Sequence, residues 1–104
     1  MNEHCTPCHK VIPALDKTEI DTLLQSLNSN WKVVPPHHLT REYTFKNFKE
    51  ALDFTVRVGE LAEAEGHHPD IALSWGKVII TLWTHKINGL SHNDFILARK
   101  IDAL

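Results

Sequence analysis

Apolar residues recur at helical spacing in three stretches of the chain. The longest stretch runs from residue 46 to 65 and is followed by Gly66, a residue type that readily adopts the left-handed conformation past a helix end. Each shorter stretch starts with a capping-box pair, Asp16 with Glu19 and Ser91 with Asp94. The pattern therefore predicts three amphipathic helices. Their apolar positions are Ile20, Leu23, Leu24 and Leu27 in the first, Phe48, Ala51, Phe54, Val58, Leu61 and Ala62 in the second, and Leu97, Ile101 and Leu104 in the third.

Four short runs between the helices are rich in β-branched and aromatic residues. Residues 31–34 and 39–45 flank a Pro-Pro-His-His connection, and residues 71–75 and 77–85 are separated by Gly76. We expect two antiparallel strand pairs. The order α-β-β-α-β-β-α requires no parallel crossover, so it predicts an α+β fold in which three helices cover one face of a four-stranded antiparallel sheet. In the last strand, alternation places Val78, Ile80, Leu82 and Thr84 on one face and Ile79, Thr81, Trp83 and His85 on the other.

Length and composition narrow the class of protein. With 104 residues the chain can enclose one modest core, which we place at residues 15–104 after an irregular leader at residues 1–14. Eleven Lys and Arg against 13 Asp and Glu give a formal charge of -2, so the basic surface of a nucleic-acid binder is missing. The longest apolar run has four residues, 95–98, so we expect neither a membrane protein nor a secreted one. Together with only two cysteines, this favours the cytoplasm.

Histidine is the one residue type in excess, with eight in the chain. Its unperturbed pKa lies near physiological pH, which makes it a natural proton-transfer group. His67 and His68 follow a helix end that carries Glu63, although helix C-termini disfavour carboxylates. A carboxylate there could instead fix an imidazole tautomer for proton transfer. Taken singly, however, the pair also suits a solvated turn, His85 a hydrogen-bonded sheet residue, and Asp94 a helix cap.

The joint spacing of these residues is more specific than any one of them. Glu63, His67-His68-Pro69, Trp75, His85 and Asp94 stand at the intervals of the pterin-4a-carbinolamine dehydratases, which the chain resembles from about residue 31 to 104. The segments FKNFKEALDFTVRVGELAEAEGHHPD and THKINGLSHNDF resemble that family as well. The leader HCTPCHK is similar to bacterial members associated with phenylalanine hydroxylase. The predicted order of elements is that family's fold.

This resemblance implies dehydration of 4a-hydroxytetrahydrobiopterin to quinonoid dihydropterin, which recycles the cofactor of aromatic amino acid hydroxylases. Loss of hydroxide from C4a needs a general acid and loss of the N5 proton needs a base, so imidazoles can do both without metal or organic cofactor. The resemblance assigns proton exchange to His67 and His85 and substrate binding to His68, and it leaves open which ring is the acid. It also implies a homodimer or homotetramer. The supporting or substrate-binding positions would be Glu63, Pro69, Asp70, Trp75, Trp83 and Asp94.

Two other classes of function are open to this sequence. One is a small zinc site, because Cys5 and Cys8 have the Cys-x-x-Cys spacing of soft metal ligands. Further ligands could come from His4, His9, His37 and His38. The other is a protein-binding module, since relatives in the family also act as dimerisation cofactors or assembly factors. The complete set of motif residues favours catalysis over both.

Overall fold

A computed structural model describes residues 14–35 and 37–104, so nearly all of the expected leader lies outside the described residues. The chain folds in the predicted order, α-β-β-α-β-β-α, with one short 3-10 helix added before the last α-helix. The elements are α1 (Lys17–Gln25), β1 (Lys32–Val34), β2 (His38–Thr44), α2 (Phe48–Glu65), β3 (Asp70–Ser74), β4 (Lys77–Leu82), η1 (His85–Ile87) and α3 (His92–Asp102). The predicted capping boxes start α1 and α3. No helix in these two ranges is long and apolar enough to cross a lipid bilayer.

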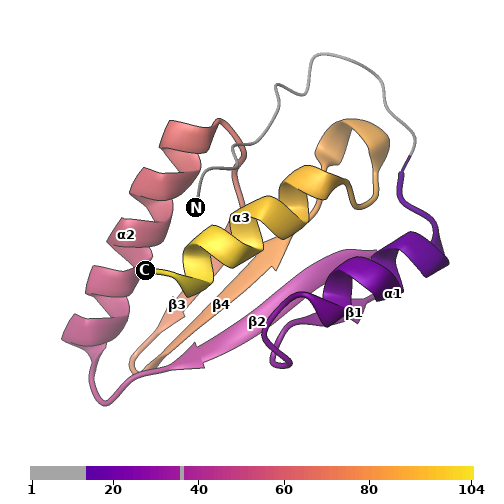
Figure 1. The fold of residues 1–104 in the computed structure, drawn as a ribbon. Helices are drawn as coiled ribbons and strands as arrows, with labels where there is room; N and C mark the ends of the chain where they lie inside the picture. The colour runs from indigo at the N-terminus through magenta and orange to yellow at the C-terminus, as the bar shows by residue number, and fades with distance from the viewer. Residues whose placement is uncertain (1–13, 36) are drawn as a thin grey trace.

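The four strands form one antiparallel sheet in the order β1-β2-β4-β3, and the helices lie over one of its faces (Figure 1). The pairing of Leu39 with Leu82 sets which side chains share that face. Leu39, Val78, Ile80 and Leu82 are all fully buried there. The same core receives apolar side chains from each helix, which confirms the predicted α+β architecture. They are Ile20 from α1, Ala51 and Val58 from α2, and Phe95, Leu97, Ala98 and Ile101 from α3.

The fourth strand is shorter than predicted, because β4 ends at Leu82 and His85 begins η1. Thr84 and Gly89 form an isolated bridge, in which the Thr84 N–H donates to the Gly89 carbonyl over 2.8 Å. The chain therefore doubles back in a tight loop rather than continuing the sheet. A Cβ at position 89 would lie 2.8 Å from the Ala14 Cβ, so glycine is needed there for space. His85 consequently stands on a turn at the end of the sheet.

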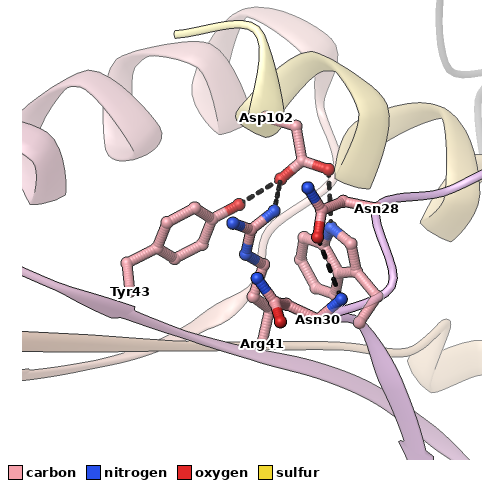
Figure 2. Close-up of polar contacts among 6 residues, drawn as sticks. Asn28, Asn30, Arg41, Tyr43 and Asp102 are labelled. Carbon is pink, nitrogen blue, oxygen red and sulfur yellow. Dashed lines mark hydrogen bonds and ion pairs between the residues drawn. The ribbon is translucent and has the colours of Figure 1, made fainter.

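The end of α3 is tied to the sheet by one carboxylate, that of Asp102. It accepts hydrogen bonds from Trp31 Nε1 at 2.8 Å, from Arg41 Nη1 at 2.9 Å and from the Tyr43 hydroxyl (Figure 2). Burial, followed by the hydrogen bond to Asp102, raises the pKa of Tyr43 well above its ordinary value, so the phenol remains a donor. The three donors come from the β1–β2 side of the sheet, and Asp102 is the last residue of α3. This cluster fixes how α3 lies across the sheet.

We expect Asp102→Ala to lower the free energy of unfolding by about 2 to 4 kcal/mol, because it leaves three largely buried donors without their acceptor. Asp53→Ala is the matched control, since Asp53 pairs only with Lys49 at an exposed i,i+4 position in the contacts described. That change is expected to cost no more than about 0.5 kcal/mol. Urea denaturation of both variants measures the difference. Equal stability of the two would show that the Asp102 cluster contributes nothing.

Candidate active site

The end of α2 turns His67 into the interior of the protein. Gly66 takes the left-handed conformation, with φ 67° and ψ 25°. Its N–H donates to the Glu63 carbonyl at 3.3 Å, and the His67 N–H donates to the Ala62 carbonyl at 3.2 Å. These two bonds satisfy carbonyls that a helix end leaves free and reverse the direction of the chain. The His67 side chain is therefore buried, with 6% of the residue exposed, immediately after an exposed helix end.

Inside the protein, His67 meets the carboxylate of Asp94, which is fully buried. His67 Nε2 lies 2.6 Å from Asp94 Oδ1, and because a carboxylate only accepts, Nε2 is the donor. The other oxygen, Oδ2, accepts from the Ser91 N–H and the Thr84 hydroxyl, each at 2.9 Å. One carboxylate thus caps α3 and orients His67. With Nε2 engaged, Nδ1 is the ring nitrogen left for a ligand.

Two glutamates at the end of α2, Glu63 and Glu65, each lie near a basic side chain, although the helix dipole disfavours carboxylates there. Glu65 Oε2 lies 3.1 Å from Lys100 Nζ of α3, and both residues are partly buried. Glu63 Oε1 lies 3.6 Å from His68 Nε2, and both of these side chains are exposed. The Glu65 pair anchors the helix end against α3. The predicted association of Glu63 with a histidine is present in the geometry, at ion-pair distance from His68.

His85 lies in the same region, three residues after the C-terminal end of β4. Its ring stacks with Trp83, with centroids 4.3 Å apart and planes at 13°. Trp83 also stacks with His38, with centroids 4.0 Å apart and planes at 12°. Stacking of this kind fixes the ring plane of an otherwise exposed side chain. The turn at η1 and the stacking contact with the Trp83 indole together determine the orientation of the His85 imidazole.

The three histidines line one cavity of about 190 Å³, with His67 on its buried side and His68 and His85 toward solvent. The remaining lining residues are Gly66, Trp83, Thr84 and Lys86. Larger hollows exist, of about 780 Å³ between α1 and β1 and about 470 Å³ between β2, α2 and α3, but His67, His68 and His85 line neither. We take the smaller cavity as the candidate site, because titratable groups converge there.

A family model described as pterin 4 alpha carbinolamine dehydratase matches residues 13–104. The chain belongs to this dehydratase family. The match covers the whole described domain, including α1, which lies before the region whose resemblance the motifs indicated. The cavity formed by the motif histidines is therefore the cavity of a dehydratase-family protein.

Curated relatives of this dehydratase-family chain cover nearly its whole length. A protein of Alkaliphilus metalliredigens is 57% identical over 94% of this chain and 88% of its own, and one of Rubrobacter xylanophilus is 50% identical over 98% and 94%. Both carry names that assign them provisionally to pterin-4-alpha-carbinolamine dehydratase. Among solved structures, a transcriptional coactivator/pterin dehydratase from Brucella melitensis aligns with a TM-score of 0.81 and 33% identity, over 86% of this chain and 96% of that one.

Another solved structure shows only that the fold is shared. A pterin dehydratase-like protein identified as a RuBisCO assembly factor aligns with a TM-score of 0.57 at 24% identity, over 70% of this chain and 83% of that one. The dehydratase-family fold therefore occurs in proteins whose names describe quite different roles. Function has to be argued from the side chains in the cavity.

Not every motif position of this dehydratase-family chain lies at the cavity. Trp75 stands in the turn between β3 and β4, 69% exposed and outside the cavity lining, and its supporting role stays a prediction. Pro69 and Asp70 lead into β3, where Asp70 pairs with Thr81, and they do not line the cavity either. Trp83 does line it, although β4 ends at Leu82, so that neither Trp83 nor His85 belongs to the strand on which their shared face was predicted.

Sequence reasoning missed two lining residues of the cavity and one residue that contacts its lining. Thr84 and Lys86 line the cavity, and His38 stacks with Trp83. One signal for Thr84 was available, because alternation placed this polar residue on the buried face of an otherwise apolar strand. For His38 there was none, since its contact depends on the pairing of β2 with β4.

Within residues 14–35 and 37–104, no group of three or more His, Cys, Asp or Glu side chains is arranged to hold a metal ion. The proposed zinc ligands Cys5 and Cys8 lie outside the described residues, as do His4 and His9. His38, another proposed ligand, is stacked on Trp83. The zinc alternative therefore stays a prediction that the described residues do not address.

Proposed function

We propose that this protein dehydrates a 4a-hydroxytetrahydropterin to the quinonoid dihydropterin and water by histidine acid–base catalysis. The observation that carries the proposal is the convergence of His67, His68 and His85 on one cavity, although the first and last are 18 positions apart in the chain. Two groups that can each hold or release a proton near neutral pH are what the elimination of water requires. Membership of the family supplies the class of substrate.

The tautomer of His67 suits the role of base. Its Nε2 proton is held by Asp94, so the neutral ring presents the Nδ1 lone pair. When Nδ1 takes the N5 proton of the substrate, the electrons of the N–H bond form the C4a=N5 double bond and the C4a–O bond breaks. His85, in its protonated form, gives its proton to the departing hydroxyl, which leaves as water. His85 is exposed, so it can regain a proton from solvent.

The rest of the cavity suits a compact bicyclic ring. Its volume of about 190 Å³ is below the usual range for drug-sized ligands, so the pterin ring would enter while its side chain points outward. Trp83 offers an aromatic edge for packing against the heterocycle. His68 stands at the solvent side, where it can hydrogen-bond to the substrate, with the Glu63 carboxylate 3.6 Å away.

We expect the purified protein to accelerate the appearance of quinonoid dihydropterin above the spontaneous rate. The measurement is a stopped-flow ultraviolet trace. A hydroxylase generates the 4a-hydroxy compound, and the trace with an excess of the purified dehydratase-family protein is compared with the trace without it. The acceleration should persist after dialysis against a metal chelator, because imidazoles supply both proton transfers. A trace identical with and without the protein would refute the proposed activity, and loss of the acceleration after chelation would support the zinc alternative.

The family resemblance also leads us to propose an assembly into homodimers or homotetramers in the cytoplasm, and a role in cofactor recycling for phenylalanine hydroxylase. In the described sheet, β1 and β3 are the edge strands, and such edges can pair with another chain. The Brucella relative is named as both a coactivator and a dehydratase, so a protein-binding role stays the alternative. The intact set of cavity histidines is the reason to prefer catalysis.

A further inference from the structure

Thr84 lines the same cavity as the two histidines proposed to transfer protons, although the proposed reaction gives it no part. The residue is buried, with 3% of its surface exposed. Its hydroxyl oxygen lies 2.8 Å from Ser91 Oγ and 2.9 Å from Asp94 Oδ2. A hydroxyl has one proton and a carboxylate oxygen has none, so Thr84 donates to Asp94 and Ser91 donates to Thr84. The result is a hydrogen-bond chain with one direction, which ends on the carboxylate that holds His67.

This series of hydrogen bonds fixes the orientation of the Asp94 carboxylate toward His67. Oδ2 receives two donors, the Thr84 hydroxyl and the Ser91 N–H, and Oδ1 receives His67 Nε2. Two donors on one oxygen fix the plane of the carboxylate, whereas a single backbone N–H would leave it able to rotate. Asp94 has no exposed surface, so water cannot replace a lost donor without rearrangement. The Thr84 hydroxyl is thus the side-chain donor that sets the orientation of the carboxylate.

The backbone of the same residue supports the turn that carries His85. The Thr84 N–H donates to the Gly89 carbonyl at 2.8 Å, and the Thr84 carbonyl accepts from the Ile87 and Gly89 N–H groups at 3.3 and 3.4 Å. His85 is the next residue along the chain and the first of η1. The Thr84 side chain therefore contacts Asp94, which binds the His67 ring, and the Thr84 main chain holds the turn that carries His85.

We propose that Thr84 is a positioning residue for the dehydration, an inference that rests on the proposed function. Its hydroxyl holds Asp94 so that the carboxylate accepts from His67 Nε2, and this keeps Nδ1 of His67 unprotonated toward the substrate. The main-chain bonds do not depend on the side chain, so loss of the hydroxyl disturbs His67 and leaves the turn of His85 in place. This separation makes the proposal testable by changing one oxygen atom.

Thr84→Val removes the hydroxyl and keeps the shape of the side chain. We expect it to lower kcat on the order of 10- to 100-fold, with KM changed by less than about 2-fold, because a misaligned base slows proton transfer more than it weakens binding. Thr84→Ser, which restores the donor, should stay within about 3-fold of the wild type. Thr84→Cys differs from the serine variant only in its weak S–H donor and should be impaired like valine, so it replaces Thr84→Val if that variant does not fold.

A second measurement reports the tautomer of the His67 ring directly. In ¹⁵N spectra of the substrate-free protein, the His67 ring, assigned by its absence in His67→Ala, should show a protonated Nε2 and a bare Nδ1. The valine or cysteine variant should show a mixture of tautomers, and the serine variant the wild-type spectrum. Thr81→Val is the matched control, three residues earlier and within β4, because the Thr81 hydroxyl lies 3.4 Å from Thr40 Oγ1 and outside the cavity. It should change neither rate nor spectrum.

The two hypotheses fail in different ways. An inactive wild-type protein with the expected His67 tautomer would refute the proposed reaction, and with it the role of Thr84 in that reaction. An active wild type whose valine and cysteine variants keep both the rate and the tautomer would overturn the role of Thr84 alone. A serine variant as slow as valine would overturn it too, because the methyl group rather than the hydroxyl would then matter.

Discussion

Replacing His85 with alanine is expected to lower the rate of pterin dehydration by about two to four orders of magnitude, the usual range for a positioned acid or base. In the proposed reaction this imidazole gives the proton without which hydroxide is a poor leaving group. The side chain is exposed and its described ring contact is the stack with Trp83, so its loss should leave the fold intact. The melting temperature is therefore expected to stay within a few degrees of the wild type, about the effect of a small surface change.

His92→Ala is the matched control for this experiment. His92 is an exposed histidine at the first position of α3 and does not line the cavity. Stopped-flow traces of both variants should separate the effect of losing an imidazole in the cavity from that of losing one at the surface. An unchanged trace for His85→Ala would remove His85 from the mechanism.

Replacing Asp94 with asparagine is expected to slow dehydration by a similar two to four orders of magnitude, on the order of what a wrongly oriented base loses. The Thr84 hydroxyl and the Ser91 N–H are both donors, so they should keep the amide oxygen on their side. The amide NH₂ then faces His67, whose Nε2 must accept rather than donate. The proton moves to Nδ1, and the nitrogen that would take the N5 proton is already protonated.

The change from aspartate to asparagine at position 94 is nearly isosteric, so its effects on the rate and on the His67 tautomer can be distinguished from an effect on folding. Asp53→Asn on the exposed face of α2 provides the control for the same chemical substitution. Rates are measured by stopped flow and the tautomer by ¹⁵N shifts of the His67 ring. If Asp94→Asn kept both the wild-type rate and a protonated Nε2, the carboxylate would have no orienting role. Unfolding of the variant would be detected by circular dichroism, and Asp94→Glu then tests whether a carboxylate at a shifted position restores the tautomer.

The secondary structure was readable from local signals alone. The capping boxes at Asp16 and Ser91 predicted two helix starts, and Gly66 predicted the end of α2, because these signals depend on backbone groups only a few residues away. Alternation identified the buried face of β4 and, two residues beyond the strand, the burial of Thr84. The end of β4 was not predictable in the same way. It is set by the bridge from Thr84 to Gly89 and by the close packing of Gly89 on Ala14, a residue 75 positions away.

The sequence by itself determined the α+β fold and singled out His67, His68, His85 and Asp94 by their spacing. The tertiary structure alone decided that the three histidines share one cavity, that Asp94 binds Nε2 of His67, and that Trp75 lies away from both. The physical reason is the sequence separation over which each interaction acts. Helix caps and hydrophobic periodicity depend on residues only a few positions apart, whereas the hydrogen bond between residues 67 and 94 depends on how α3 is placed on the sheet. That placement is fixed by packing and by the Asp102 cluster, which no local pattern encodes.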